Sequence, residues 1–98
     1  MDMENKVVII TGGGRGIGAA TAELCAQNGA KVVIAELNDE WGKNIESKLQ
    51  GMGFAVDFVH CDVSKEADVE AVVKYAVDKF GKLDGIFNNA ATIVVKPV

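Results

Sequence analysis

The sequence is poor in the residues that mark secreted, metal-binding and membrane-spanning proteins. Its 98 residues include only two cysteines, one proline and 6% aromatic residues. Cys25 and Cys61 lack the close spacing of metal ligands, so we expect two buried, reduced thiols and no metal site. The longest apolar run, at 7–10, is far shorter than the ~20 residues that cross a bilayer. No targeting segment is recognisable, which makes the cytoplasm the expected location.

Positive charge is also scarce. The chain has 10 Lys and Arg residues against 14 Asp and Glu residues, giving a net charge of −4. An acidic chain without a basic stripe is a poor partner for nucleic acid or an anionic membrane. Apolar residues make up 49% and charged residues 24%, a composition typical of globular proteins. We therefore expect residues 1–98 to form one small domain or part of one.

The apolar pattern alternates between strands and helices. β-Branched runs at 6–11 and 31–35 predict strands buried on both faces, as in a parallel sheet. Shorter runs at 54–59 and 83–88 predict two more strands. Between consecutive strands, the apolar residues recur at helical spacing. The order βαβαβαβ predicts an α/β fold of Rossmann type with an open parallel sheet of four strands and three helices.

Local signals mark the ends of the three expected helices. The first covers 17–28 and ends where Gly29 can adopt a left-handed conformation. Asn38 and Ser64 are expected to cap the second and third helices, and Gly81 to end the third. The second helix should bury a stripe of four side chains: Trp41, Ile45, Leu49 and Met52.

Such a sheet would be incomplete. If the third strand returns past the first, the first two helices cover one face and the third helix stands alone on the other. The fourth strand would then keep an unpaired edge. We expect a larger sheet, or self-association through this edge.

A glycine-rich loop at 11–18 lies between the first strand and the first helix. Bare amides and a helix N-terminus there suit a phosphate. A phosphate-loop motif fails because alanines follow the last glycine instead of Lys and Ser or Thr. Two dinucleotide registers remain: one uses Gly14, Gly16 and the alanine at 19, and the other uses Gly12, Gly16 and Gly18. The second is favoured, because Gly12 then turns the chain out of the strand.

Glu36 follows the second strand, where a carboxylate can accept hydrogen bonds from both hydroxyls of an adenine ribose. It would repel a 2′-phosphate, by about 4 kcal/mol at ~4 Å in an effective dielectric of ~20. This predicts that NAD is preferred over NADP. Arg15 argues the other way, since it could pair with a 2′-phosphate; otherwise it is a solvated loop cation.

Four segments together carry a family resemblance. They are Thr11-Gly12-x-x-x-Gly16-Ile17-Gly18, Glu36, Asp62-Val63, and Leu83-Asp84 leading into Asn88-Asn89-Ala90-Ala91. In this order they resemble the N-terminal, cofactor-binding half of the short-chain dehydrogenases/reductases, although Ala91 replaces the usual glycine. The resemblance implies that the cofactor contacts Thr11, Gly12, Gly14, Arg15, Gly16, Ile17, Gly18, Glu36, Leu37, Asp62, Val63, Asn89, Ala90 and Ala91.

Several of these residues also have structural interpretations. Asp62 could cap the loop before Ser64, Asp84 is expected to be structural, and Asn88 and Asn89 could satisfy backbone groups where the sheet ends. His60, at the end of the third strand, is expected to be structural as well.

The resemblance implies hydride transfer between nicotinamide and an alcohol or carbonyl substrate. The family uses a Tyr, a Lys four residues later and an upstream Ser. Tyr75, Lys79 and Ser64 have this spacing, but they precede the fourth strand. At ~1.5 Å per residue, Tyr75 lies about 16 Å from Ser64 along a helix that leads away from the ligand edge of the sheet. We therefore assign no catalytic residue, and expect Tyr75 to be half-buried and Lys79 solvated.

The sequence is compatible with a second class of function, and a third fits it less well. A stand-alone, non-catalytic dinucleotide-binding module, acting as a sensor or assembly subunit, remains the alternative. Another nucleotide or adenosyl-cofactor enzyme of Rossmann type is disfavoured by the Asp62-Val63 and Asn88-Asn89-Ala90 matches. A small-molecule substrate is expected only if the chain continues beyond Val98.

Overall fold

A computed structural model describes residues 2–89 and has the predicted βαβαβαβ order. The elements are β1 (Val7–Thr11), α1 (Gly16–Gln27), β2 (Lys31–Glu36), α2 (Asp39–Gly51), β3 (Val56–His60), α3 (Glu66–Phe80) and β4 (Gly85–Asn88). The four strands form one sheet in the order β3-β2-β1-β4, and each adjacent pair is parallel. The predicted α/β Rossmann-type sheet is confirmed.

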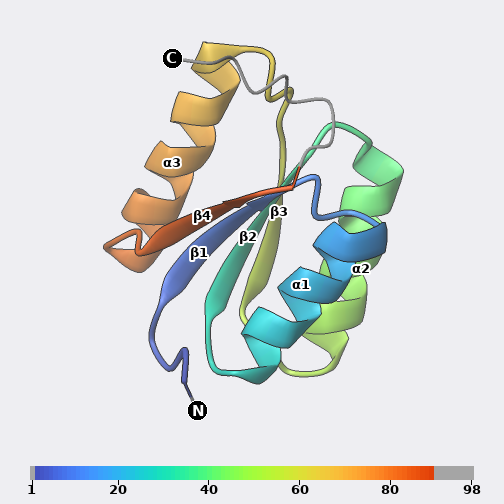
Figure 1. The fold of residues 1–98 in the computed structure, drawn as a ribbon, viewed down its shortest axis with the longest axis vertical. Coiled ribbons are helices and arrows are strands. Elements are labelled where there is room, and N and C mark those ends of the chain that lie inside the picture. Colours follow the sequence, from blue (N-terminus) through green and yellow to red (C-terminus); the bar gives the residue numbers. More distant parts are fainter. Residues whose placement is uncertain (1, 90–98) are drawn as a thin grey trace.

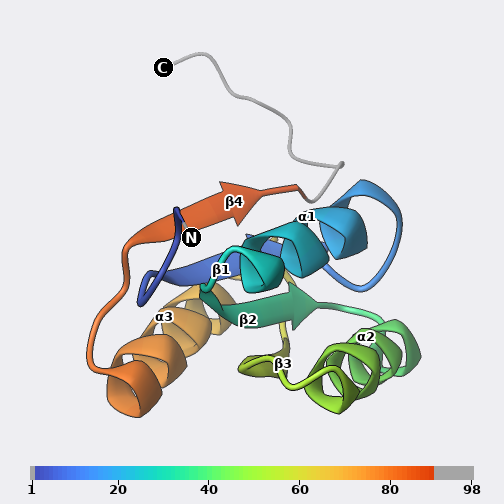
Figure 2. The ribbon, with the colours of Figure 1, turned by 90° about the horizontal axis from the view of Figure 1, so that it is seen from below.

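The helices cover both faces of the sheet, with α1 and α2 on one face and α3 on the other (Figures 1 and 2). Alternate residues of β1 divide between the two cores: Val8 and Ile10 pack under α1 and α2, and Val7 and Ile9 under α3. This distribution of the helices over the two faces is as predicted, but the predicted strand order, in which the third strand returns past the first, is wrong. β3 stays beside β2, and the chain crosses to the far side of β1 only after β3. The continuous burial of β1 is the reason for its unbroken β-branched run.

The strand register brings all four carboxyl ends to one edge of the sheet. Thr11 is paired with Ala35 on one side and with Asn88 on the other, and Glu36 is paired with His60. The outer edge of β4 forms the margin of the described sheet, where Ile86 and Phe87 are 48% and 44% exposed. The described helices include none long and apolar enough to span a bilayer.

Most predicted helix ends are confirmed. The side chain of Asn38 accepts the Trp41 N–H at 3.0 Å and so caps α2. Gly29 and Gly81 have φ of 99° and 84°, the left-handed geometry expected where α1 and α3 end. Both cysteines are buried and unpaired, as expected.

Three local predictions are wrong. Lys65, not Ser64, is the N-cap residue of α3, because the Ser64 hydroxyl donates to the Asp62 carboxylate instead. Met52 is 48% exposed, because it lies beyond the last turn of α2. β3 and β4 each begin two residues later than predicted, because the residues before them lie in connecting loops.

Candidate functional site

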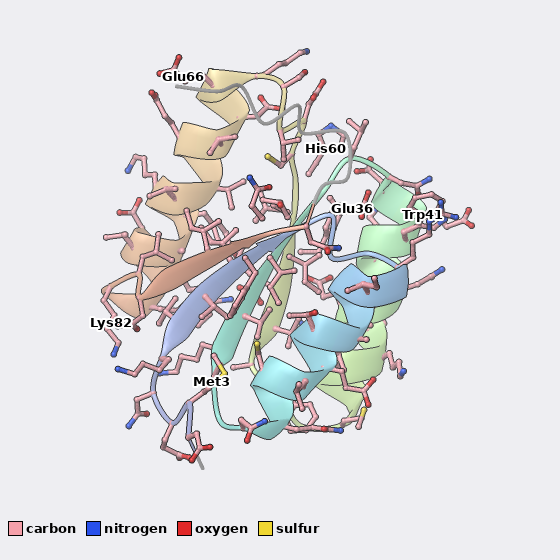
Figure 3. All side chains as sticks on the ribbon, in the orientation of Figure 1. Met3, Glu36, Trp41, His60, Glu66 and Lys82 are labelled. Atoms are coloured by element: carbon pink, nitrogen blue, oxygen red, sulfur yellow. The ribbon has the colours of Figure 1, made fainter. Side chains whose placement is uncertain are left out.

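A cavity of about 380 Å³ opens at the carboxyl ends of the strands. The lining residues come from the glycine loop, the end of β2, the first turn of α2 and the segment after β3: Gly12, Arg15, Gly16, Ala35, Glu36, Leu37, Trp41, Cys61, Asp62, Val63, Ser64 and Asn89. Figure 3 shows Glu36, Trp41 and His60 at this end of the molecule, and Met3 and Lys82 at the other. Ligands of open parallel sheets bind at this carboxyl edge.

The glycine loop leaves β1 through Gly12, whose φ of 65° disfavours any side chain. The N–H of Gly12 donates to the carbonyl of Ala35 at 2.8 Å, which joins the loop to β2. A Cβ on Gly18 would lie 2.1 Å from the Gly12 carbonyl oxygen, so α1 can approach the loop this closely only with glycine there. These contacts support the register through Gly12, Gly16 and Gly18.

The loop fits a phosphate in both geometry and charge. Helix α1 begins at Gly16, which has a φ of 60° and open space where a Cβ would stand. The first turn of α1 contains no acidic residue and no side chain caps it, so its N–H groups and the positive end of the helix dipole remain available to an anion beside Gly16.

The Glu36 carboxylate is held in place by the backbone. One oxygen accepts the Gly14 N–H at 2.9 Å and the other accepts the Asn38 N–H at 3.0 Å. The residue is only 6% exposed and lines the cavity. Each carboxylate oxygen has a further lone pair, so two backbone bonds leave acceptor capacity for hydroxyl groups of a ligand. A Cβ on Gly14 would come within 2.7 Å of the carboxylate, so this contact too depends on glycine.

Arg15 and Trp41 form one wall of the cavity. The guanidinium carbon of Arg15 lies 4.1 Å from the centroid of the Trp41 ring, within the range of a cation–π contact. Sequence reasoning placed Trp41 in the buried stripe of α2, but it is only partly buried. Its position five residues after Glu36, in the first turn of the following helix, was the available signal that it could reach the loop.

The segment after β3 forms the opposite side of the cavity. The Asp62 carboxylate accepts the Ser64 hydroxyl at 2.6 Å and the Ser64 N–H at 3.0 Å. These bonds lower the pKa of Asp62 and give it the loop-capping role that was one of its two interpretations. Burial raises the pKa of the neighbouring Cys61 thiol, as do the charges of Asp68 and Asp62. Cys61 is therefore a neutral wall of the cavity.

Thr11 joins the ends of β1 and β4. Its hydroxyl donates to the Asn88 side chain at 2.9 Å and accepts the Asn89 N–H at 2.9 Å. These bonds agree with a role for both asparagines in satisfying polar groups where the sheet ends, and they hold Asn89 against the cavity. Asp84 is structural, since its carboxylate accepts the Val7 N–H at 2.8 Å at the other end of β1.

The structure brings eight of the implied cofactor residues to the cavity: Gly12, Arg15, Gly16, Glu36, Leu37, Asp62, Val63 and Asn89. Thr11, Gly14, Ile17 and Gly18 belong to the same loop and helix start without lining the cavity, and Ile17 is 77% exposed. Ala90 and Ala91 lie outside the described residues. The lining residues that sequence reasoning missed are Ala35, Trp41, Cys61 and Ser64.

Tyr75 and Lys79 lie away from this cavity. The Tyr75 hydroxyl donates to the Asp57 carboxylate at 2.7 Å, and the Lys79 ammonium pairs with the same carboxylate oxygen. Asp57 is the second residue of β3, near the end of the sheet opposite the cavity. Lys79 is exposed as expected, and it also pairs with the buried Asp57, which the sequence did not indicate. His60 is structural as expected, pairing with Asp39 at 2.7 Å.

Comparison with known proteins decides the family. A family model described as short chain dehydrogenase matches residues 6–98. The chain belongs to this family. It is 54% identical over 91 residues to tropinone reductase-like 1 of Erythroxylum coca, covering 93% of this chain and 32% of that protein. It is 47% identical over 96 residues to an uncharacterized oxidoreductase of Thermotoga maritima, covering 98% and 38% respectively. The chain thus spans about a third of the length of these short-chain dehydrogenase relatives.

Solved structures agree with this membership. A short chain dehydrogenase/reductase from Burkholderia phymatum in complex with NAD superposes with a TM-score of 0.84 at 35% identity, over 88% of this chain and 31% of that one. Glucose dehydrogenase of Caenorhabditis elegans gives a TM-score of 0.87 at 36% identity, over 95% and 40%. The chain is therefore a Rossmann-type portion of a short-chain dehydrogenase, and it covers about a third of the length of the relatives that it matches.

Proposed function

We propose that this chain binds NAD in preference to NADP and serves hydride transfer between nicotinamide and an alcohol or carbonyl substrate. The observation that carries the preference is Glu36, a buried carboxylate that lines the cavity and is oriented by two backbone N–H groups. A 2′-phosphate beside it would meet an uncompensated negative charge, whereas two ribose hydroxyls would find acceptors.

The cavity offers a place for each part of a dinucleotide. The open amides at the start of α1 suit the diphosphate, with Gly12 and Gly18 allowing the close approach. Leu37, Asp62 and Val63 would surround the adenine end. In the proposal, Thr11, Gly14, Arg15 and Ile17 complete the loop contacts, and Asn89, Ala90 and Ala91 lie along the remainder of the cofactor.

The chemistry would belong to the nicotinamide, which donates or accepts a hydride when it is bound. The residues of this chain bind and orient. None of its described side chains is placed as the acid or base, because the one Tyr and Lys pair of suitable spacing is engaged with Asp57. A substrate and a catalytic Tyr, Lys and Ser are proposed only if the chain continues beyond Val98.

Titration with NADH tests the binding site directly. Trp41 is the single tryptophan of the sequence and lines the cavity, so bound NADH should quench its emission and gain fluorescence by energy transfer. NADPH should produce the same signal only at higher concentration. A folded chain that gives no transfer and no saturable change with either dinucleotide would contradict the proposal.

The exposed edge of β4 suggests a partner for this chain. Copies of this chain are proposed to associate through the exposed edge of β4, where Ile86 and Phe87 leave apolar surface. Sedimentation at two concentrations would detect the association, and an Ile86→Lys variant should abolish it. A cytoplasmic location is also proposed, and fractionation of cells that express the protein would test it.

A further inference from the structure

We propose that Trp41 is a positioning residue for cofactor discrimination. By stacking with the Arg15 guanidinium, it prevents this cation from pairing with the Glu36 carboxylate. The inference rests on the proposed function, since it concerns how the same site distinguishes NAD from NADP. It assigns a role to a side chain that the sequence pattern placed in the hydrophobic core.

Trp41 is the more constrained partner in the contact between Arg15 and Trp41. The Asn38 side chain accepts the Trp41 N–H and fixes the first turn of α2 against the end of β2. Gly14 packs beside Trp41, and a Cβ on Gly14 would lie 2.8 Å from the Trp41 Cβ. Arg15 is exposed on the glycine loop and has its guanidinium carbon 4.1 Å from the ring centroid. The backbone of Trp41 is thus held beside the glycine loop, and the guanidinium of the exposed Arg15 lies against the Trp41 ring.

The charges around the cavity make this placement matter. Among the described residues that line the cavity, Arg15 is the one Lys or Arg. It takes part in none of the ion pairs found within residues 2–89. The Glu36 carboxylate is satisfied by two neutral amides. Within residues 2–89 Glu36 forms no ion pair, so its negative charge faces the cavity without a paired cation.

Releasing Arg15 would change the discrimination by either of two routes. The guanidinium could pair with Glu36 and cancel the charge that repels a 2′-phosphate, or it could bind the 2′-phosphate directly. Both routes favour NADPH relative to NADH. An exposed cation–π contact corresponds to a shift of about two- to fivefold in an equilibrium, which is about 0.5–1 kcal/mol.

The test compares dissociation constants for NADH and NADPH, measured by nicotinamide fluorescence so that no tryptophan is needed. Trp41→Ala should move the NADPH-to-NADH affinity ratio toward NADPH by about two- to fivefold. Trp41→Phe, which keeps an aromatic face, should retain most of the original ratio. Met52→Ala removes an exposed apolar side chain at the other end of α2 and should leave the ratio unchanged.

A double-mutant cycle separates positioning from general loosening of the site. In an Arg15→Ala background, Trp41→Ala should no longer change the ratio, because no cation remains to be released. An unchanged ratio in Trp41→Ala, a shift toward NADH, or an equal shift without Arg15 would each overturn the inference. Absence of saturable binding of either dinucleotide by the parent chain would instead overturn the proposed function.

Discussion

Replacing Glu36 by glutamine is the sharpest single perturbation of the site. The substitution keeps the side-chain volume and one acceptor oxygen but removes the negative charge. In the parent, the two carboxylate oxygens accept the Gly14 and Asn38 amides at 2.9 and 3.0 Å, and the residue is 6% exposed. A carboxamide can accept only one of these bonds, because its nitrogen is a donor. The other amide loses its acceptor, which should lower the free energy of unfolding by about 1–3 kcal/mol.

The effect on cofactor preference is separate from the effect on stability. A 2′-phosphate about 4 Å from Glu36 is opposed by roughly 4 kcal/mol per pair of unit charges at an effective dielectric of ~20. Solvent in the open cavity reduces this figure, but even ~1.4 kcal/mol is a tenfold change. Bonds from the ribose hydroxyls to a charged acceptor also weaken when the charge is removed. NADH should therefore bind more weakly, and the NADPH-to-NADH affinity ratio should rise at least about tenfold.

Parallel titrations of NADH and NADPH would measure this ratio, with urea denaturation reporting stability. Glu40→Gln is the matched control, because it removes the same charge from an exposed position in the first turn of α2. It should leave the ratio where it is. If Glu36→Gln folds, binds NADH and still shows the parental ratio, then the carboxylate does not select the cofactor and the reasoning is refuted.

Three other outcomes follow from contacts at and around the site. Gly18→Ala should cost about 1–3 kcal/mol of stability and weaken NADH binding, because its Cβ would collide with the loop carbonyl 2.1 Å away; Gly51→Ala, with open space around it, should do neither in the same assays. Tyr75→Phe should lower stability by about 0.5–1.5 kcal/mol without changing NADH affinity, which would separate this residue from the cofactor site. The bond to Asp57 raises the pKa of Tyr75, so the stability that this bond contributes should be present below about pH 10 and lost as pH rises further. The urea midpoints of the parent and of Tyr75→Phe should therefore converge as the pH rises above about 10. The Val7 N–H lowers the pKa of Asp84, so its contribution should be present above about pH 4 and lost on acidification; Asp84→Asn should flatten that acid dependence of the urea midpoint.

The order of elements was predictable because each one is marked by local chemistry. The buried β-branched strands, the Asn38 cap and the left-handed Gly29 and Gly81 all act over a few residues, and the structure has each of them where the sequence indicated. The α3 cap was not predictable in this way. Ser64 is a good capping residue by type, but Asp62 lies two residues earlier and takes its hydroxyl and its N–H in a tighter local turn.

The route of the chain and the partners of charged groups depend on contacts that are distant in sequence. No local pattern says that Asp57 on β3 will meet Lys79 on α3, 22 residues later. The same limit applies to Glu36. Its position after β2 indicated a ligand role, but its bond to the Gly14 amide, 22 residues earlier, appears only when the glycine loop turns back over the end of that strand.

Trp41 shows how a correct pattern can assign a wrong environment. Helical spacing places it on one stripe with Ile45 and Leu49, which are 7% and 0% exposed in the core. Periodicity gives the direction of a side chain around the helix axis but not the point along the axis at which the sheet beneath it ends. The first turn of α2 follows the end of β2, and Trp41 in that turn lies beside Gly14 and Arg15 of the glycine loop. A large aromatic side chain at that point has the glycine loop as its neighbour. Trp41 therefore contacts Arg15 and lines the cavity. The apolar periodicity of α2 alone could not have indicated this position.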